Sequence, residues 1–113
     1  MEDSILISIK KLLGISAADT SFDIDVITHI NSTFSTLTQL GVGPSNGFRI
    51  DNSLVNWSDY IPEDDNRLEL IKTYMFMKVK LMFDPPSSGT IMDSYNRQIN
   101  ELEWRINSIV DCN

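Results

Sequence analysis

The chain offers little thiol or imidazole chemistry. Its 113 residues include one cysteine, Cys112, and one histidine, His29. A single cysteine excludes a disulfide within the chain, which is typical of proteins from reducing compartments. One histidine and one cysteine also cannot supply the four ligands of a structural zinc site. We therefore expect Cys112 to be a free thiol at the chain end, and we expect no metal ion.

Positive charge is also scarce, because 9 Lys and Arg stand against 16 Asp and Glu and give a formal net charge of -7. An acidic chain gains no counterion-release energy from phosphates, so nucleic acid and anionic membranes are both disfavoured as partners. No apolar run approaches the length of a transmembrane span. Residues 1–4 are acidic, whereas a secretory signal starts with basic residues. These features predict a cytosolic protein that does not bind membranes.

Apolar residues are plentiful, and they recur at helical spacing. The hydrophobic fraction of 42% and the charged fraction of 22% are ordinary for one globular domain over residues 1–113. Steps of three and four predict a short helix from about Ile5 to Gly14 and long helices near 22–40, 67–83 and 90–110. The sequence therefore predicts a mainly α protein, a small helical bundle.

Each predicted helix has its own pattern. Asp3 or Ser4 can cap the first helix, and Gly14 ends it. The expected core stripe of the second helix comprises Ile24, Ile27, Ile30, Phe34, Leu37 and Leu40. The third helix is apolar on two faces and should be central. The fourth has a heptad-like stripe formed by Met92, Tyr95, Ile99, Leu102, Ile106 and Ile109, which predicts an antiparallel pair with the third.

The segment over residues 44–62 breaks the helical pattern. It begins with the turn residues of Pro44-Ser45-Asn46-Gly47 and then alternates apolar and polar side chains around Phe48 and Ile50. Both a short hairpin and an ordered loop fit this pattern. The acids after Pro62 are typical of a helix start.

No catalytic constellation is recognisable. His29 lies inside the second predicted helix and is expected at the surface or the core boundary rather than in a triad. Residues 19–25 have acids at crude calcium-like spacing, but they lack the central glycine and closing glutamate of an EF-hand. Residues 41–44 lack the Gly-Lys-Ser/Thr ending of a phosphate loop. We therefore expect no enzymatic activity and no cofactor.

Large aromatic residues in the middle segment and the last helix are the candidate interface residues. Phe48, Trp57 and Tyr60 lie in a predicted loop, with Arg49 beside Phe48, and loop aromatics are favoured interface anchors. The alternative is that these aromatics cover one end of the bundle. Trp104 lies off the core stripe, so it either marks a contact surface or widens the core face.

Four strings, in this order and spacing, resemble head–tail connector proteins (head-completion or portal adaptor proteins) of tailed bacteriophages. They are residues 22–32 (FDIDVITHINS), 39–44 (QLGVGP), 80–86 (KLMFDPP) and 101–107 (ELEWRIN). The resemblance implies a non-enzymatic helical subunit that forms a ring, dodecameric on the virion, beneath the portal protein. It also implies that the ring extends the DNA channel without specific DNA binding and docks the next connector, stopper or tail protein. The expected location is the head–tail junction of the virion, with assembly in the host cytoplasm.

Other functions remain open from the sequence. A small acidic helical regulator, such as an antitoxin or an inhibitor that mimics nucleic acid, would need a compact cluster of surface carboxylates. A helix-turn-helix DNA-binding protein would need free basic residues, and Lys72, Lys78 and Lys80 form the one local basic cluster. These lysines lie on the helix that is expected to be central.

Overall fold

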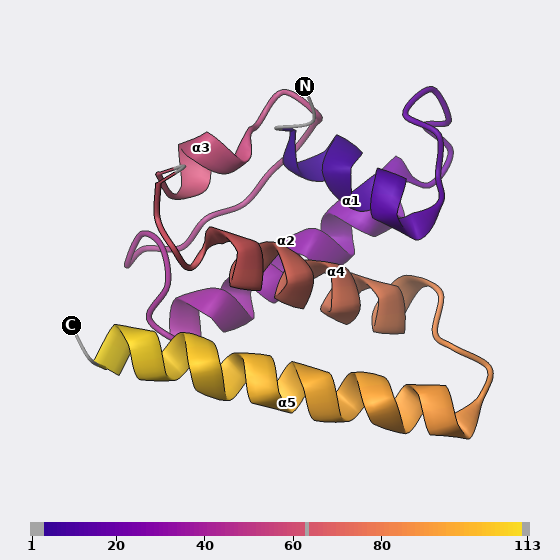
Figure 1. The fold of residues 1–113 in the computed structure, drawn as a ribbon. Helices are drawn as coiled ribbons and strands as arrows, with labels where there is room; N and C mark the ends of the chain where they lie inside the picture. The colour runs from indigo at the N-terminus through magenta and orange to yellow at the C-terminus, as the bar shows by residue number, and fades with distance from the viewer. Residues whose placement is uncertain (1–3, 63, 112–113) are drawn as a thin grey trace.

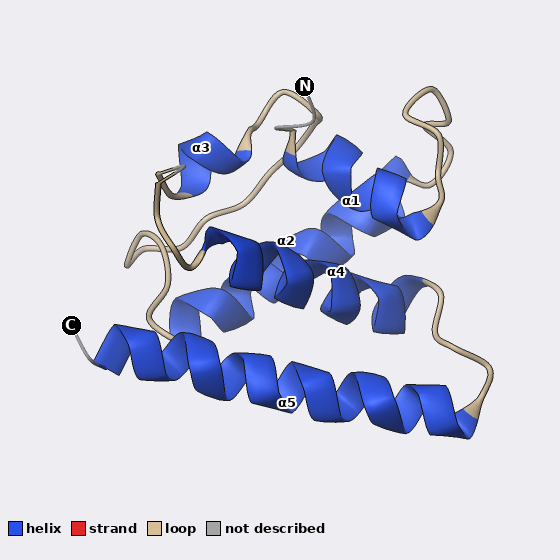
Figure 2. Ribbon diagram, in the orientation of Figure 1, coloured by secondary structure: helices blue, strands red, loops and turns tan. Residues whose placement is uncertain are grey.

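A computed structural model describes residues 4–62 and 64–111 of the chain. Over this part the protein contains five helices and no strand (Figures 1 and 2). The helices are α1 (Ile5–Leu13), α2 (Asp23–Gln39), α3 (Trp57–Tyr60), α4 (Leu68–Phe83) and α5 (Gly89–Asp111). The predicted mainly α bundle is confirmed. Asp3, Glu63 and Cys112 lie outside the described residues.

The ends of α1 are set by two local signals that the sequence carries. The Ser4 hydroxyl accepts a hydrogen bond from the Ile7 N–H at 3.2 Å and so satisfies one free amide of the first turn. Gly14 ends the helix with φ +83°, a left-handed conformation that favours glycine. Of the two predicted caps, Ser4 is therefore confirmed.

The buried face of α2 differs at one position from the expected stripe. Val26, Ile30, Phe34 and Leu37 are fully buried, whereas Ile24 is 81% exposed. Val26 lies four residues before Ile30 and shares its face, but Ile24 lies six residues before it and points elsewhere. The assignment of Ile24 to the core was therefore wrong.

Helix α4 is central, as predicted, because it packs against α1, α2 and α5. Its fully buried side chains include Ile71, Tyr74, Met75 and Val79, which lie on more than one side of the helix. Helix α5 runs antiparallel to α4 along one side of the molecule (Figure 1). The predicted antiparallel pair is therefore confirmed.

The contact between α4 and α5 combines an apolar seam with one polar link. Ile99, Leu102 and Ile106 are the buried side chains of α5 among those described, while the side chain of Ile109 lies outside the described part. The Tyr74 hydroxyl on α4 donates to the Glu103 carboxylate on α5 at 2.7 Å. Burial, together with this hydrogen bond, raises the pKa of Tyr74.

The middle segment is an ordered loop that ends in the single turn of α3, so the alternative of a short hairpin is wrong. One isolated antiparallel bridge joins Ser4 to Asn56, and the Ile5 N–H donates to the Val55 carbonyl at 3.0 Å. The Asp59 carboxylate accepts from the Asn56 N–H at 2.8 Å and holds the start of α3. The loop therefore pairs with the start of α1 rather than with itself.

A buried lysine joins α1 to α2. Lys10 is 1% exposed, and its ammonium forms an ion pair of 2.7 Å with the Asp23 carboxylate. The same ammonium donates to the carbonyl oxygens of Asp19 at 2.7 Å and Ala17 at 3.4 Å. A buried ammonium needs such partners because desolvation is costly. Lys10 thereby holds the linker between the two helices.

Gly43 lies close against the ring of Tyr60. It has φ +78°, and a Cβ placed there would lie 2.6 Å from Cε1 of Tyr60. Gly47 has φ +94°, but a Cβ there would meet nothing within 4 Å. Both glycines therefore need a positive φ, which favours glycine. At Gly43 a side chain would also clash with Tyr60.

We predict that Gly43→Ala lowers the free energy of unfolding more than Gly47→Ala. Each substitution should cost about 1–2 kcal/mol for the left-handed backbone. Gly43→Ala should cost about 1–3 kcal/mol more because Tyr60 must shift. Urea unfolding of both variants measures the difference, and equal losses would contradict the close contact between Gly43 and Tyr60.

We predict that the protein loses stability above pH 10 as buried tyrosines ionise. Burial raises the pKa of both Tyr74 and Tyr60. Each tyrosine therefore makes its full contribution to the free energy of unfolding below about pH 10, the pKa of tyrosine in the unfolded chain. Above this pH the contribution of each tyrosine falls by about 1.4 kcal/mol per pH unit. Urea unfolding between pH 9 and 11.5 should show a shallower loss for Tyr74→Phe than for the parent. Identical slopes would show that the pKa of Tyr74 is the same in the folded and the unfolded protein.

Candidate assembly surfaces

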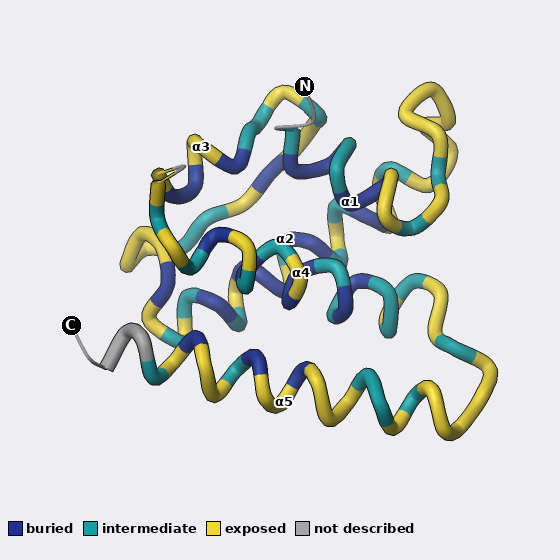
Figure 3. The backbone as a smooth tube through the Cα atoms, viewed as in Figure 1, coloured by how far each residue is buried: buried dark blue, intermediate teal, exposed yellow. Residues whose placement is uncertain are grey.

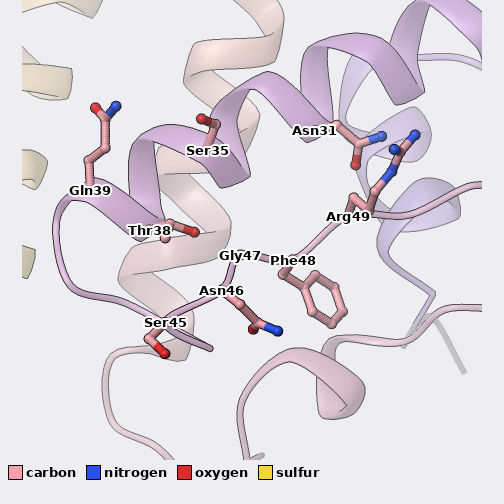
Figure 4. Close-up of a pocket in the computed structure, with 9 residues that line it drawn as sticks. All are labelled: Asn31, Ser35, Thr38, Gln39, Ser45, Asn46, Gly47, Phe48 and Arg49. Atoms are coloured by element: carbon pink, nitrogen blue, oxygen red, sulfur yellow. The ribbon is translucent and has the colours of Figure 1, made fainter.

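A polar groove lies between α2 and the first part of the middle loop (Figure 4). Its volume is about 590 Å³. The lining residues are Asn31, Ser35, Thr38 and Gln39 from α2 and Ser45, Asn46, Gly47, Phe48 and Arg49 from the loop. Arg49 is the one charged residue among them.

Asn31 fixes the loop wall of the groove. Its side-chain amide donates to the Ile50 carbonyl at 2.9 Å, and its amide oxygen accepts from the Ile50 N–H at 2.8 Å. Ile50 is 1% exposed, so both backbone groups would otherwise be buried without a partner. The Asn31 side chain thus pairs with the Ile50 backbone as the backbone of a neighbouring strand would in a sheet.

An aromatic layer supports the groove from beneath. The Phe34 ring of α2 contacts Phe48 at 5.1 Å and Tyr60 at 4.6 Å between ring centroids, and Phe48 contacts Tyr60 at 4.9 Å. Trp57 lies 6.4 Å from Phe34. Tilted and edge-to-face rings at these distances attract one another beyond their burial. The layer holds Phe48 half-buried at the edge of the groove.

The structure corrects the interface assignment of Trp57 and Tyr60. Both are buried in the core, at 0% and 6% exposure, so a partner cannot reach them in this conformation. The Trp57 Nε1–H donates to the Ser8 hydroxyl at 2.9 Å, which satisfies its polar group within the fold. These two rings cover one end of the bundle, which was the alternative for the middle-loop aromatics.

The other three candidates reach the surface at two separate places. Phe48 is half-buried and lines the groove, and Arg49 beside it is exposed and pairs loosely with Asp51 at 3.5 Å. Trp104 is 70% exposed on α5. Figure 3 shows that α5 buries only the side that faces α4. The structure therefore brings Phe48 and Arg49 together and leaves Trp104 on its own face.

Some of the acidic side chains have local structural roles. Among residues 4–62 and 64–111, no group of three His, Cys, Asp or Glu side chains could hold a metal ion. Hydrogen bonds from Ser21 lower the pKa of Asp19, and a hydrogen bond from Arg67 is the main cause of the lowered pKa of Asp65. These hydrogen bonds within the chain explain the lowered pKa values of both carboxylates.

The lysines of α4 are not a free basic surface. All three are half-buried, with the ammonium of Lys72 5.9 Å from the Trp57 ring centroid and that of Lys78 6.0 Å from Tyr74. Lys80 forms an ion pair with Asp84 at 2.9 Å. A recognition helix for DNA would instead present its basic side chains to the major groove.

The family model of phage connector proteins matches residues 5–113. The chain belongs to the phage connector protein family. This is a family of structural proteins of the virion, which assemble with other head and tail proteins. No curated protein and no solved structure matches the chain. In the described part of this connector protein, no helix is both long and apolar enough to cross a membrane.

Two residues that hold the middle loop could not be recognised from the sequence. In the sequence Asn31 looks like an ordinary polar residue of α2. Its role becomes visible only in the structure, where its side-chain amide bonds the buried backbone of Ile50. In the sequence Gly43 looks like part of a helix end, and no neighbouring residue indicates that Tyr60 packs against its backbone. Both roles depend on contacts between segments far apart in the chain.

We predict that Asn31→Ala lowers the free energy of unfolding by about 1–3 kcal/mol, because the Ile50 N–H and C=O lose both partners. The matched control Asn100→Ala removes an exposed asparagine from α5 and should change it by less than about 0.5 kcal/mol. Urea unfolding gives both values, and limited proteolysis should cut residues 44–50 faster in Asn31→Ala alone. Equal stability of the two variants would show that Asn31 does not hold the loop.

Proposed function

We propose that this connector protein is a ring-forming subunit that sits beneath the portal, extends the DNA channel and docks the next connector, stopper or tail protein. The match to the connector family over residues 5–113 is the observation that carries the proposal. The ring is dodecameric on the virion, because it continues a dodecameric portal. The subunit has no catalytic role, and it assembles in the host cytoplasm.

Two surface features suit a subunit with several neighbours. Helix α5 has 23 residues and packs mainly against α4, so its outer face is free for contact. The groove between α2 and the middle loop is a second surface, and the aromatic layer packs beneath it. A subunit within a ring must contact a neighbour on each side, and separate surfaces meet this need.

The acidic surface suits a channel through which DNA moves. With a formal net charge of -7, the subunit repels phosphate rather than gripping it. Exposed carboxylates such as Asp25, Asp51 and Glu101 come from different elements of the fold. DNA would therefore pass a ring of such subunits without specific binding.

The distribution of charge does not favour the regulatory alternative. Ion pairs engage Asp23 with Lys10, Asp65 with Arg67 and Asp84 with Lys80. Glu103 accepts from Tyr74, and Asp59 caps α3. A mimic of nucleic acid needs an array of unpaired carboxylates. Here many of the acids are dispersed and serve the fold.

We predict that phage heads made without this protein fail to join tails, and that adding the purified protein restores joining. Electron microscopy counts joined particles, and an unrelated acidic protein of the same size is the control. The protein should also co-sediment with portal-bearing heads but not with heads that lack the portal. Normal tail joining without the protein, together with no binding to portal-bearing heads, would overturn the proposed function.

A further inference from the structure

We propose that one end of the helical bundle docks a segment of a head or tail protein that presents apolar side chains flanked by lysine or arginine. This open end comprises residues 10–25 and 80–93, which include the ends of α1 and α4 and the starts of α2 and α5. The inference rests on the proposed function, because it takes the partner from the neighbours of a connector. It adds which surface the partner covers and which chemistry the partner needs.

The two ends of the bundle differ in how the core is covered. At one end the rings of Trp57 and Tyr60 close the core. The open end lies on the side of the molecule away from α3, where residues 14–22 and 84–88 connect the helices (Figure 1). Neither connection contains a buried residue, so neither closes the core at this end.

The core stripes of four helices continue onto the open end. Each stripe has one large apolar residue there, one helical turn beyond its neighbour in the stripe, and these residues are between 39% and 56% exposed. They are Leu12 beyond Ile9, Phe22 beyond Val26, Met82 beyond Val79 and Ile91 beyond Tyr95. Exposed apolar surface within a polar rim is typical of protein contact sites. The core is therefore incomplete at this end, and a partner can complete it.

Contacts across the open end join these residues into one surface. The Phe22 ring meets the Phe83 ring edge-to-face at 5.5 Å between centroids, which joins the start of α2 to the end of α4. The buried Lys10 ammonium pairs with Asp23 and donates to the Asp19 carbonyl, so it ties the end of α1 to the residues around Phe22. A short turn then connects α4 to α5. The apolar surface is therefore shared by four helices.

The charges at the open end favour a basic partner. The open end contains five aspartates and three lysines, and two of the lysines are ion-paired with aspartates of the same end. The remaining charged groups are the carboxylates of Asp19, Asp25 and Asp93 and the ammonium of Lys11. None of these four forms an ion pair with a residue in the described part of the chain. Three negative charges against one positive charge attract lysine or arginine.

The same charges disfavour two other occupants. A second copy that docked its own open end would bring two negative surfaces together, because a symmetric pair uses the same surface on both copies. Nucleic acid presents phosphates, which the excess of carboxylates repels. A basic protein segment instead gains attraction at the rim, while its apolar side chains cover the exposed ones.

A variant with less apolar surface tests the contact. Met82→Ser combined with Ile91→Ser changes two exposed side chains, so its midpoint of urea unfolding should match that of the parent. Co-sedimentation is measured separately with portal-bearing heads and with tails. We expect this variant to bind one of these assemblies at least about tenfold more weakly and the other as the parent does. The control Leu54→Ser changes an 81% exposed residue of the middle loop and should bind both normally.

A variant with less negative charge tests the chemistry of the partner. Asp25→Asn combined with Asp93→Asn should weaken binding to the same assembly by about threefold at low salt. The difference from the parent should vanish near about 1 M salt, because screening removes the attraction. The control Asp64→Asn changes an exposed acid before the start of α4, away from the open end, and should have no effect.

Photo-cross-linking of assembled particles identifies the partner segment directly. The chain carries Cys112→Ser and Ser87→Cys, and the new thiol in the exposed turn between α4 and α5 holds a benzophenone maleimide. After illumination, mass spectrometry gives the sequence of the attached peptide. We expect a segment of a head or tail protein with large apolar residues and with lysine or arginine beside them. This measurement leaves the apolar surface of the open end unchanged.

The outcomes separate this contact from the proposed function. Selective loss of one assembly by Met82→Ser with Ile91→Ser, together with a basic apolar cross-linked segment, supports the proposal. Normal binding of this variant to both assemblies, or a cross-link to an acidic segment or to a second copy of the chain, would overturn the contact and leave the proposed function standing. A parent protein that binds neither portal-bearing heads nor tails would overturn both.

Discussion

Helix α4 has apolar side chains on more than one side, and the arrangement of the other helices follows from the need to cover them. It packs against α1, α2 and α5, and its buried Tyr74 reaches Glu103 across the seam to α5. Because α5 covers one side of this core helix, its own outer face remains free. The central burial of α4 therefore leaves the outer face of α5 exposed.

The same constraint explains the groove. Helix α2 packs against α4 and buries Ile30 and Leu37. Asn31 on the same helix holds the loop backbone at Ile50. The aromatic layer formed by Phe34, Phe48 and Tyr60 packs beneath the loop.

Much of the helical fold could be predicted from the sequence, because periodic apolar residues and caps are local signals. The central place of α4, the cap at Ser4 and the stop at Gly14 were all predicted correctly. The core stripe of α2 failed at Ile24, since spacing alone could not decide between it and Val26. The candidate assembly surfaces were harder to predict from the sequence. Exposed Trp104 and buried Trp57 look alike in sequence, and only the contacts between distant segments separate them.

The central claim is that copies of this connector protein form a ring at the head–tail junction of the virion. A cryo-electron microscopy reconstruction of that junction tests it most directly. The account predicts a ring of helical subunits directly beneath the portal, each with the α2, α4 and α5 arrangement described above. A junction in which portal and tail meet without this chain would contradict the account.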